Sequence, residues 1–147
     1  MKRVKPVKEH CIGCHLCELA CLTAHSASGD LILAYTKERP AGLLPCKSVF
    51  HRGANAVAMS CQHCADPKCV HACIAGALFR DPASGRIDYD ETRCVGCWSC
   101  VMACPFGSIG RDPVKGKIFK CDLCKDRGSP ACIEVCPNAA LVLENDE

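Results

Sequence analysis

The chain has 147 residues, a formal charge of +2 at pH 7 and 17 cysteines, but only 5% aromatic residues. A nearly neutral charge supplies no basic surface, so nucleic acid is not a predicted partner. No apolar run reaches the roughly 18 residues of a membrane span, so no direct membrane span is predicted. Aromatic side chains are too few for a large core, and metals or disulfides must supply much of the folding free energy.

The cysteines favour metal over disulfides. The N-terminal segment, Met1 to Pro6, lacks the apolar core of a secretory signal, which predicts a cytoplasmic protein. In a reducing compartment, dense cysteines at regular spacing indicate metal binding. An odd total of 17 also suits a complete disulfide framework poorly.

Sixteen of the cysteines fall into four groups of four. In chain order the groups are Cys11, Cys14, Cys17 and Cys21; Cys61, Cys64, Cys69 and Cys73; Cys94, Cys97, Cys100 and Cys104; and Cys121, Cys124, Cys132 and Cys136. Cys46 lies outside them. We expect it to be a partly buried free thiol, with a role as substitute ligand as the alternative.

The third group has the spacing Cys-x-x-Cys-x-x-Cys-x-x-x-Cys-Pro, which is typical of bacterial ferredoxins that bind 4Fe-4S clusters. Three closely spaced thiolates wrap one loop around three irons, and the fourth cysteine ligates the other cluster. A single Cys-x-x-Cys pair also suits tetrahedral zinc. Sixteen cysteines, with endings at Pro105 and Pro137, favour four iron–sulfur clusters instead.

An internal repeat surrounds the third group. Residues 80–87, Arg-Asp-Pro-Ala-Ser-Gly-Arg-Ile, recur 31 positions later as Arg-Asp-Pro-Val-Lys-Gly-Lys-Ile. Each copy predicts a hairpin, because Asp-Pro starts a turn and glycine accepts a positive φ. The expected strand pairs are 77–79 with 87–89, and 109 with 118–120. A cysteine loop, a short helix and a hairpin, used twice, is the build of a bacterial ferredoxin.

The two ends of the chain complement each other. Strand-like residues 3–8 precede group one, and strand-like residues 139–143 follow group four, as in one ferredoxin split open. We therefore predict an α+β fold of two ferredoxin-like modules, one inserted into the other. The outer module takes residues 1–59 and 121–147, and the inserted module takes residues 60–120. A connecting arm, residues 22–59, should hold a strand at 31–35 and a turn at 39–42.

Sharing of the fourth cysteine within each module predicts four ligand sets, as a hypothesis. The first is Cys11, Cys14 and Cys17 with Cys136; the second is Cys61, Cys64 and Cys69 with Cys104; the third is Cys94, Cys97 and Cys100 with Cys73; and the fourth is Cys121, Cys124 and Cys132 with Cys21. Each loaded set adds about −2, so four clusters would change the formal charge of +2 to about −6.

Three histidines lie inside the cysteine loops: His15, His63 and His71. Cysteines already fill every ligand position, so histidine ligands are not needed. These side chains are instead candidates for donating hydrogen bonds to cluster sulfur, which tunes the reduction potential.

Several motifs carry a family resemblance that extends from Cys11 to Leu143. They are Cys-Ile-Gly-Cys at 11–14, Ala-His-Ser at 24–26, Asp-Pro-Lys-Cys at 66–69, Cys-Val-Gly-Cys-Trp-Ser-Cys at 94–100 and Lys-Cys-Asp-Leu-Cys at 120–124. The chain resembles the four-cluster ferredoxin-like electron-transfer subunits of anaerobic oxidoreductases. It is most similar to the iron–sulfur subunit that accompanies nickel-containing carbon monoxide dehydrogenase.

The resemblance implies a subunit that relays single electrons through four 4Fe-4S clusters. Its partners would be a catalytic oxidoreductase of the carbon monoxide dehydrogenase, aldehyde oxidoreductase or formate dehydrogenase type, and an acceptor such as a flavoprotein, a ferredoxin or a hydrogenase. The sequence shows no catalytic pair, phosphate loop or dinucleotide fingerprint, so we expect no catalysis by this chain alone. The alternative is a redox or oxygen sensor, which would need one labile cluster and an output domain.

Overall fold

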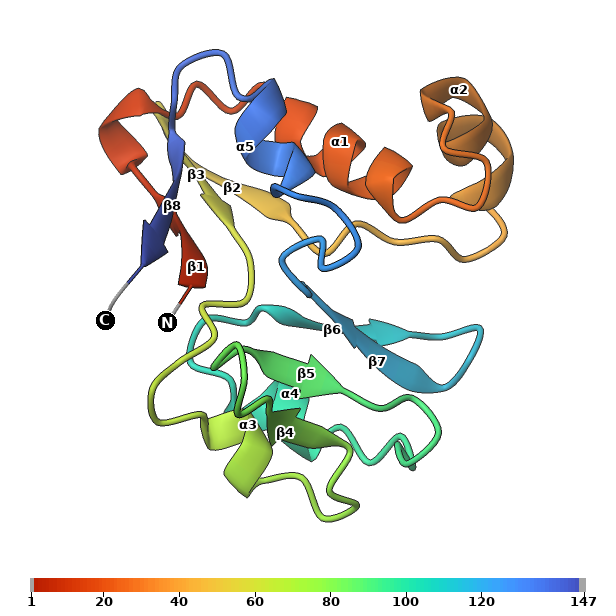
Figure 1. Cartoon of the computed structure of the whole chain (residues 1–147). Helices are drawn as coiled ribbons and strands as arrows, with labels where there is room; N and C mark the ends of the chain where they lie inside the picture. Colours follow the sequence, from red (N-terminus) through yellow and green to blue (C-terminus); the bar gives the residue numbers. More distant parts are fainter. Residues whose placement is uncertain (1, 146–147) are drawn as a thin grey trace.

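The computed structural model describes residues 2–145, which form an α+β chain divided into two lobes (Figure 1). We call residues 60–120 the middle lobe, and residues 2–59 with 121–145 the outer lobe. All strands found in residues 2–145 pair as two-stranded antiparallel sheets. None of the helices in this range is long and apolar enough to cross a membrane.

The middle lobe repeats one unit twice. Helix α3 (Lys68–His71) precedes the pair β4 (Leu78–Arg80) and β5 (Ile87–Tyr89), and helix α4 (Ser99–Ala103) precedes the pair β6 (Ile109–Asp112) and β7 (Lys117–Lys120). Both hairpins expected from the repeat are confirmed. Their turns are held by aspartate side chains: Asp81 accepts from Ala83 N at 3.1 Å, and Asp112 accepts from Val114 N at 2.9 Å.

The outer lobe joins the two ends of the chain. Strand β1 (Lys2–Pro6) pairs antiparallel with β8 (Leu141–Asn145), and helix α1 (Leu16–Ala24) packs against α5 (Ala131–Val135). Both expected end strands are present but displaced toward the termini. The first ends at Pro6 because the chain turns into η1 (Lys8–His10), where His10 N donates to Val7 O at 3.2 Å.

The expected strand at 31–35 is wrong, because this segment is helical. Helix α2 (Leu31–Leu33) continues into the π-helix η2 (Ala34–Glu38). Asp30 caps the start, its side chain accepting from Leu33 N at 3.0 Å, and this local hydrogen bond outweighs the apolar run that suggested a strand. The turn at 39–42 is confirmed: Gly42 N donates to Arg39 O at 3.1 Å, and Gly42 has a φ of 116°.

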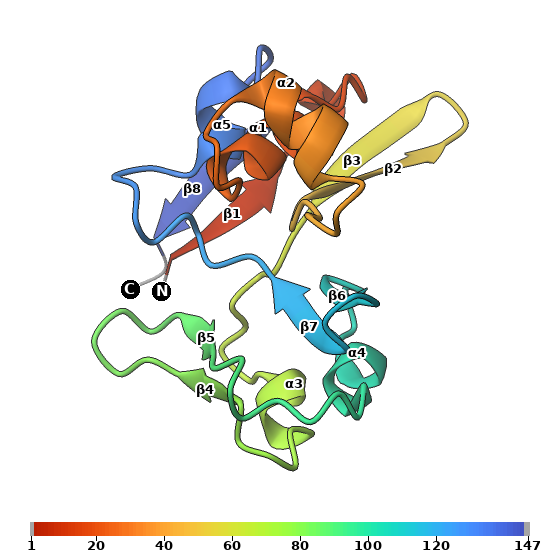
Figure 2. The same cartoon turned by 90° about the vertical axis from the view of Figure 1, so that its right-hand side faces the viewer.

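The connecting arm also contains a hairpin that was not expected from the sequence. Strand β2 (Ser48–Arg52) pairs with β3 (Asn55–Met59) across a turn in which Gly53 has a φ of 61°. Figure 2 shows this hairpin extending from the outer lobe. The signal was the alternation within β3, where Ala56 and Ala58 are buried.

Each lobe has its own apolar core. In the middle lobe the buried members are Leu78, Ile87, Cys100, Ile109 and Ile118. In the outer lobe they are Val4, Cys17, Ala58, Cys132 and Leu141. Both cores contain buried cysteines, so the thiols contribute to the packing of each lobe. The division into two modules stays a prediction, and the separate cores support it.

Candidate metal centres

Three small cavities are each lined by four cysteines. One cavity is lined by Cys11, Cys14, Cys17 and Cys136, another by Cys61, Cys64, Cys69 and Cys104, and a third by Cys73, Cys94, Cys97 and Cys100. In each case three thiols come from one cysteine group, and the fourth comes from the other cysteine group of the same lobe. The structure therefore brings together the cysteines of the first, second and third predicted sets.

The fourth predicted set lies in the interior of the outer lobe. Its members, Cys21, Cys121, Cys124 and Cys132, are all buried. Burial raises the pKa of Cys132 to about 12, and the nearby charges of Cys121, Cys21 and Cys124 raise it as well. These four side chains are thus close neighbours at the contact between α1, α5 and the loop that follows β7.

The loops of groups one and three share a left-handed backbone pattern. Gly13 and Gly96, each just before the second cysteine, have φ of 68° and 70°. His15 and Trp98, each just after it, have φ of 61° and 63°. A Cβ atom at Gly96 would lie 2.4 Å from the carbonyl oxygen of Gly116, so only glycine fits this loop against the β6–β7 turn.

Groups two and four use non-glycine residues at the corresponding position. His63 has a φ of 45° and Leu123 a φ of 60°, a conformation that costs about 1–2 kcal/mol for a residue with a side chain. Such strain persists only where the surroundings hold it. In all four groups, the residue just before the second cysteine has a left-handed backbone conformation.

Backbone amides point at several of the sulfur atoms. Ala77 N lies 3.2 Å from Cys73 Sγ, Ala140 N lies 3.3 Å from Cys136 Sγ, and Leu123 N lies 3.4 Å from Cys121 Sγ. Amide donors stabilise thiolates and cluster sulfur ligands.

Without a metal, Cys17 and Cys100 would stay protonated at neutral pH, because burial raises the pKa of each to about 11. Cluster binding must therefore displace protons from these thiols, which couples ligation to proton release. Buried Cys21 differs: hydrogen bonds from Cys46 and His25 lower its pKa to about 5.

None of the three loop histidines forms a hydrogen bond to a cysteine sulfur in residues 2–145: His15 bonds Glu18 and His51, His71 bonds Asp66, and His63 accepts from Ile87 N. The buried Nε2 of His63 has no hydrogen-bond partner among these residues, so donation from His63 to cluster sulfur stays a prediction. The histidine that does reach sulfur is His25, 3.8 Å from Cys21 Sγ. Its hydrogen bond to Asp122 raises the pKa of His25 to about 11. Its place directly after group one, at the end of α1, was the available signal.

Cys46 is half-buried, and its backbone N–H donates to Cys21 Sγ at 3.3 Å. All 17 cysteines are free thiols, as metal ligation requires. Four thiols in each set, amides directed at sulfur and the absence of disulfides among them form a donor set that fits 4Fe-4S clusters.

Comparison with known proteins agrees with this donor set. A family model described as a 4Fe-4S dicluster domain matches residues 53–146, more than half of the chain. The match crosses the boundary between the lobes and takes in groups two, three and four.

Two curated relatives and one solved structure are similar over most of the chain. An iron–sulfur protein of Rhodospirillum rubrum is 38% identical, over 90% of this chain and 76% of that protein. The beta subunit of the NADH-dependent phenylglyoxylate dehydrogenase of Aromatoleum evansii is 38% identical over 89% of this chain, but this chain spans only 27% of its length.

The solved structure is the active-site complex BamBC of benzoyl coenzyme A reductase with benzoyl-CoA. One chain of it superposes with a TM-score of 0.53 over 98% of this chain and 79% of that one, at 24% identity, which shows a common fold. The chain therefore belongs to the 4Fe-4S dicluster family of iron–sulfur electron-transport proteins, whose members include subunits of oxidoreductases.

Proposed function

We propose that the chain is a non-catalytic electron-transfer subunit that carries four 4Fe-4S clusters, one for each cysteine set. The observation that carries the proposal is the convergence of sixteen cysteines into four groups of four thiols. A 4Fe-4S cluster, when bound, accepts and returns one electron. The chain's own residues supply the thiolates, the amide donors and the burial that set how readily it does so.

The placement of the sets supports one continuous path. Within each lobe the paired helices α1 with α5, and α3 with α4, hold two sets side by side. Between the lobes, Cys61 of the second set lies near Cys121 of the fourth. Burial is the main cause that raises the pKa of Cys61, and the charge of Cys121 raises it further. The path then runs from the first set through the fourth and second to the third.

The two ends of this path reach the surface. Cys14 in the first set and Cys97 in the third are exposed, whereas all four cysteines of the fourth set are buried. Electrons would enter at one exposed end and leave at the other. We propose two ferredoxin-like modules, one inserted into the other, as the frame that keeps the sets in this order.

The partners proposed for the two ends follow from the sequence resemblance. One end would face a catalytic oxidoreductase, with nickel-containing carbon monoxide dehydrogenase as the first choice and aldehyde oxidoreductase or formate dehydrogenase as alternatives. The other end would face a flavoprotein, a ferredoxin or a hydrogenase. We also propose a reducing, cytoplasmic location, as the sequence predicts for dense cysteines that bind metal.

The cluster count is tested by metal analysis of protein prepared without oxygen. We expect about sixteen iron and sixteen acid-labile sulfide per chain, four of each per cluster. Iron near eight, with zinc making up the difference, would contradict the proposal. In Cys136→Ala, the first set should lose its spectroscopic signature; an intact signature would refute the sharing of ligands between groups.

The relay is tested by Cys14→Ser and Cys97→Ser, which damage the first and third sets. Each should slow electron delivery from the catalytic partner to the natural acceptor but leave the partner's activity with an artificial dye intact. Full delivery after loss of either cluster would place that cluster off the path. Sluggish transfer by the intact chain, together with binding to a regulator, would favour the sensor alternative.

A further inference from the structure

Two lysines are buried, an unusual position for an ammonium group. Lys47 is 2% exposed and Lys120 is 8% exposed. The Nζ atom of Lys47 donates to Ser60 Oγ at 2.8 Å, and that of Lys120 donates to the backbone oxygens of Ile87 and Cys121, the latter at 2.8 Å. All of these acceptors are neutral.

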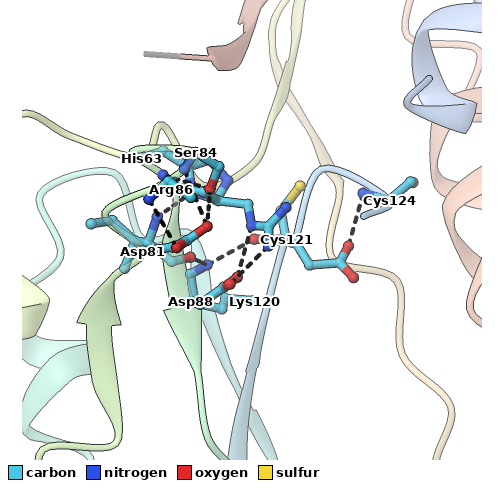
Figure 3. Close-up of polar contacts among 11 residues, drawn as sticks. His63, Asp81, Ser84, Arg86, Asp88, Lys120, Cys121 and Cys124 are labelled. Carbon is cyan, nitrogen blue, oxygen red and sulfur yellow. Dashed lines mark hydrogen bonds and ion pairs between the residues drawn. The ribbon is translucent and has the colours of Figure 1, made fainter. Parts of the chain in front are cut away.

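In residues 2–145, neither ammonium group forms an ion pair with a carboxylate. Asp88 lies beside Lys120 (Figure 3), but both of its oxygens bind Arg86, at 2.8 Å each. A buried charge without a charged partner is strongly unfavourable. Within this part of the chain no ion pair to a carboxylate balances Lys47, and the carboxylate of Asp88, whose pKa is lowered mainly by Arg86 and also by Lys120, gives Lys120 only partial compensation. A buried anion would therefore stabilise both lysines.

The groups around Lys47 are thiols of two predicted sets. Lys47 follows Cys46, whose backbone N–H donates to Cys21 Sγ of the fourth set at 3.3 Å. Lys47 also leads into β2, where Val49 packs against the outer core that holds Cys17 of the first set and Cys132 of the fourth. Lys47 thus lies between the two sets of the outer lobe.

Lys120 occupies the matching place at the lobe junction. Its Nζ atom donates to the backbone oxygen of Ile87, which lines the cavity of the second set together with Cys61 and Cys69. It also donates to the backbone oxygen of Cys121 of the fourth set at 2.8 Å, and Figure 3 shows Lys120 next to Cys121 where the chain leaves β7. Both lysines therefore lie near the fourth set, Lys47 on the side of the first set and Lys120 on the side of the second set.

The fourth set is also where an added electron would be hardest to accommodate. A cluster with four thiolates carries about −2 when oxidised and about −3 when reduced. With all four cysteines buried, water cannot solvate the extra charge as it can near the exposed Cys14 or Cys97. Two nearby ammonium groups would offset this penalty.

Resting on the proposed function, we propose that Lys47 and Lys120 are buried counter-ions of the cluster held by Cys21, Cys121, Cys124 and Cys132. They raise its reduction potential, so that the most enclosed cluster does not block the path between the lobes. The β2–β3 hairpin positions the ammonium group of Lys47. Lys47 immediately precedes the hairpin and Ser60 follows it, and the hydrogen bond between their side chains holds the ammonium group in the interior.

The test is a redox titration of the whole chain, monitored by electron paramagnetic resonance, in Lys47→Met. The signal of the fourth cluster is identified as the one lost in Cys132→Ser. We expect its reduction equilibrium constant to fall about tenfold in Lys47→Met, which is about 59 mV for one electron. Lys120→Met should lower the potentials of the fourth and second clusters and spare the third.

Two controls separate buried charge from other effects. Lys47→Arg keeps the charge and should keep the potential near that of the unmodified protein. Lys37→Met removes the same charge from an exposed site in η2 and should change no cluster potential. Failure of Lys47→Met to assemble the fourth cluster, with normal assembly in Lys47→Arg, would also support a required counter-charge.

Other outcomes overturn the inference. Full cluster content with an unchanged potential in both Lys47→Met and Lys120→Met would do so, as would equal loss of the cluster in Lys47→Met and Lys47→Arg. Neither result touches the proposed function, which fails instead if the unmodified chain lacks four clusters by iron and sulfide content.

Discussion

The middle and outer lobes use the same parts but close in different ways. The middle lobe is completed within residues 60–120 by two hairpins that are local in sequence. The outer lobe is completed by β1 and β8, whose residues Lys5 and Glu144 meet across a separation of 139 positions. One lobe is thus a continuous unit, whereas the other depends on both ends of the chain.

This difference shows how little a long connection costs in equilibrium stability. The entropy of loop closure grows only with the logarithm of length, by about 0.6 kcal/mol for each doubling. A whole lobe can therefore lie between Cys21 and Cys121 without preventing α1 from packing on α5. The cost is expected in rate, because contacts distant in sequence form slowly. We expect the middle lobe to fold first.

The largest effect should come from removing the clusters. Cysteines are members of both apolar cores, so chelation or air oxidation should unfold both lobes. Far-ultraviolet circular dichroism before and after cluster removal is the measurement. A native spectrum with an unchanged cooperative melt would show that the lobes stand without metal.

A smaller effect, confined to the middle lobe, is expected for Gly96→Ala. The new Cβ would meet the Gly116 carbonyl at 2.4 Å at a φ of 70°, so overpacking and left-handed strain together should cost about 4 kcal/mol. Iron content should fall, with the outer lobe's clusters kept. Gly128→Ala is the control, because nothing lies within 4 Å of its Cβ position. Equal iron in both variants would contradict the loop geometry.

Substitution of one matched leucine in each core would compare the contributions of the two cores to the free energy of unfolding. Leu78 in the middle core and Leu141 in the outer core each begin a strand and are each 2% exposed. Leu78→Ala and Leu141→Ala should each lower the free energy of unfolding by about 3 kcal/mol. Hydrogen exchange should localise each loss to its own lobe. Loss of protection across both lobes in either variant would mean that they fold as one unit.

The smallest effect concerns the closure of the chain ends. Lys5 and Arg3, both on β1, lower the pKa of Glu144 on β8. A carboxyl group whose pKa is lowered in the folded state stabilises the fold at any pH above its unfolded-state pKa. This contribution is lost as the pH falls through the folded-state pKa. Glu144→Gln should cause a slight decrease in the melting temperature of the outer lobe at neutral pH.

Added salt should shrink that decrease, because exposed ion pairs are screened. Glu9→Gln removes a carboxylate from η1 and serves as the control. A decrease of the same size in Glu9→Gln, or one that salt does not change, would assign the effect to net charge or to packing.

Much of the middle lobe was predictable from sequence. The Asp-Pro turns and the spaced glycines determine two hairpins through local backbone preferences, which need no distant partner. The grouping of sixteen cysteines was equally legible, because ligand spacing within a loop is itself local. The segment 31–35 was misread because an apolar run suits a strand or a helix, and the cap at Asp30 decided between them.

What only the tertiary structure decided depends on contacts between distant segments. The burial of Lys47 follows from the β2–β3 hairpin, and the contact of His25 with Cys21 and Asp122 requires α1 to lie beside the loop after β7. By sequence alone, Lys47 is one of 18 basic residues and His25 is one of six histidines. Their importance is electrostatic, and the strength of a charge depends on burial and on neighbours that only the folded chain assembles.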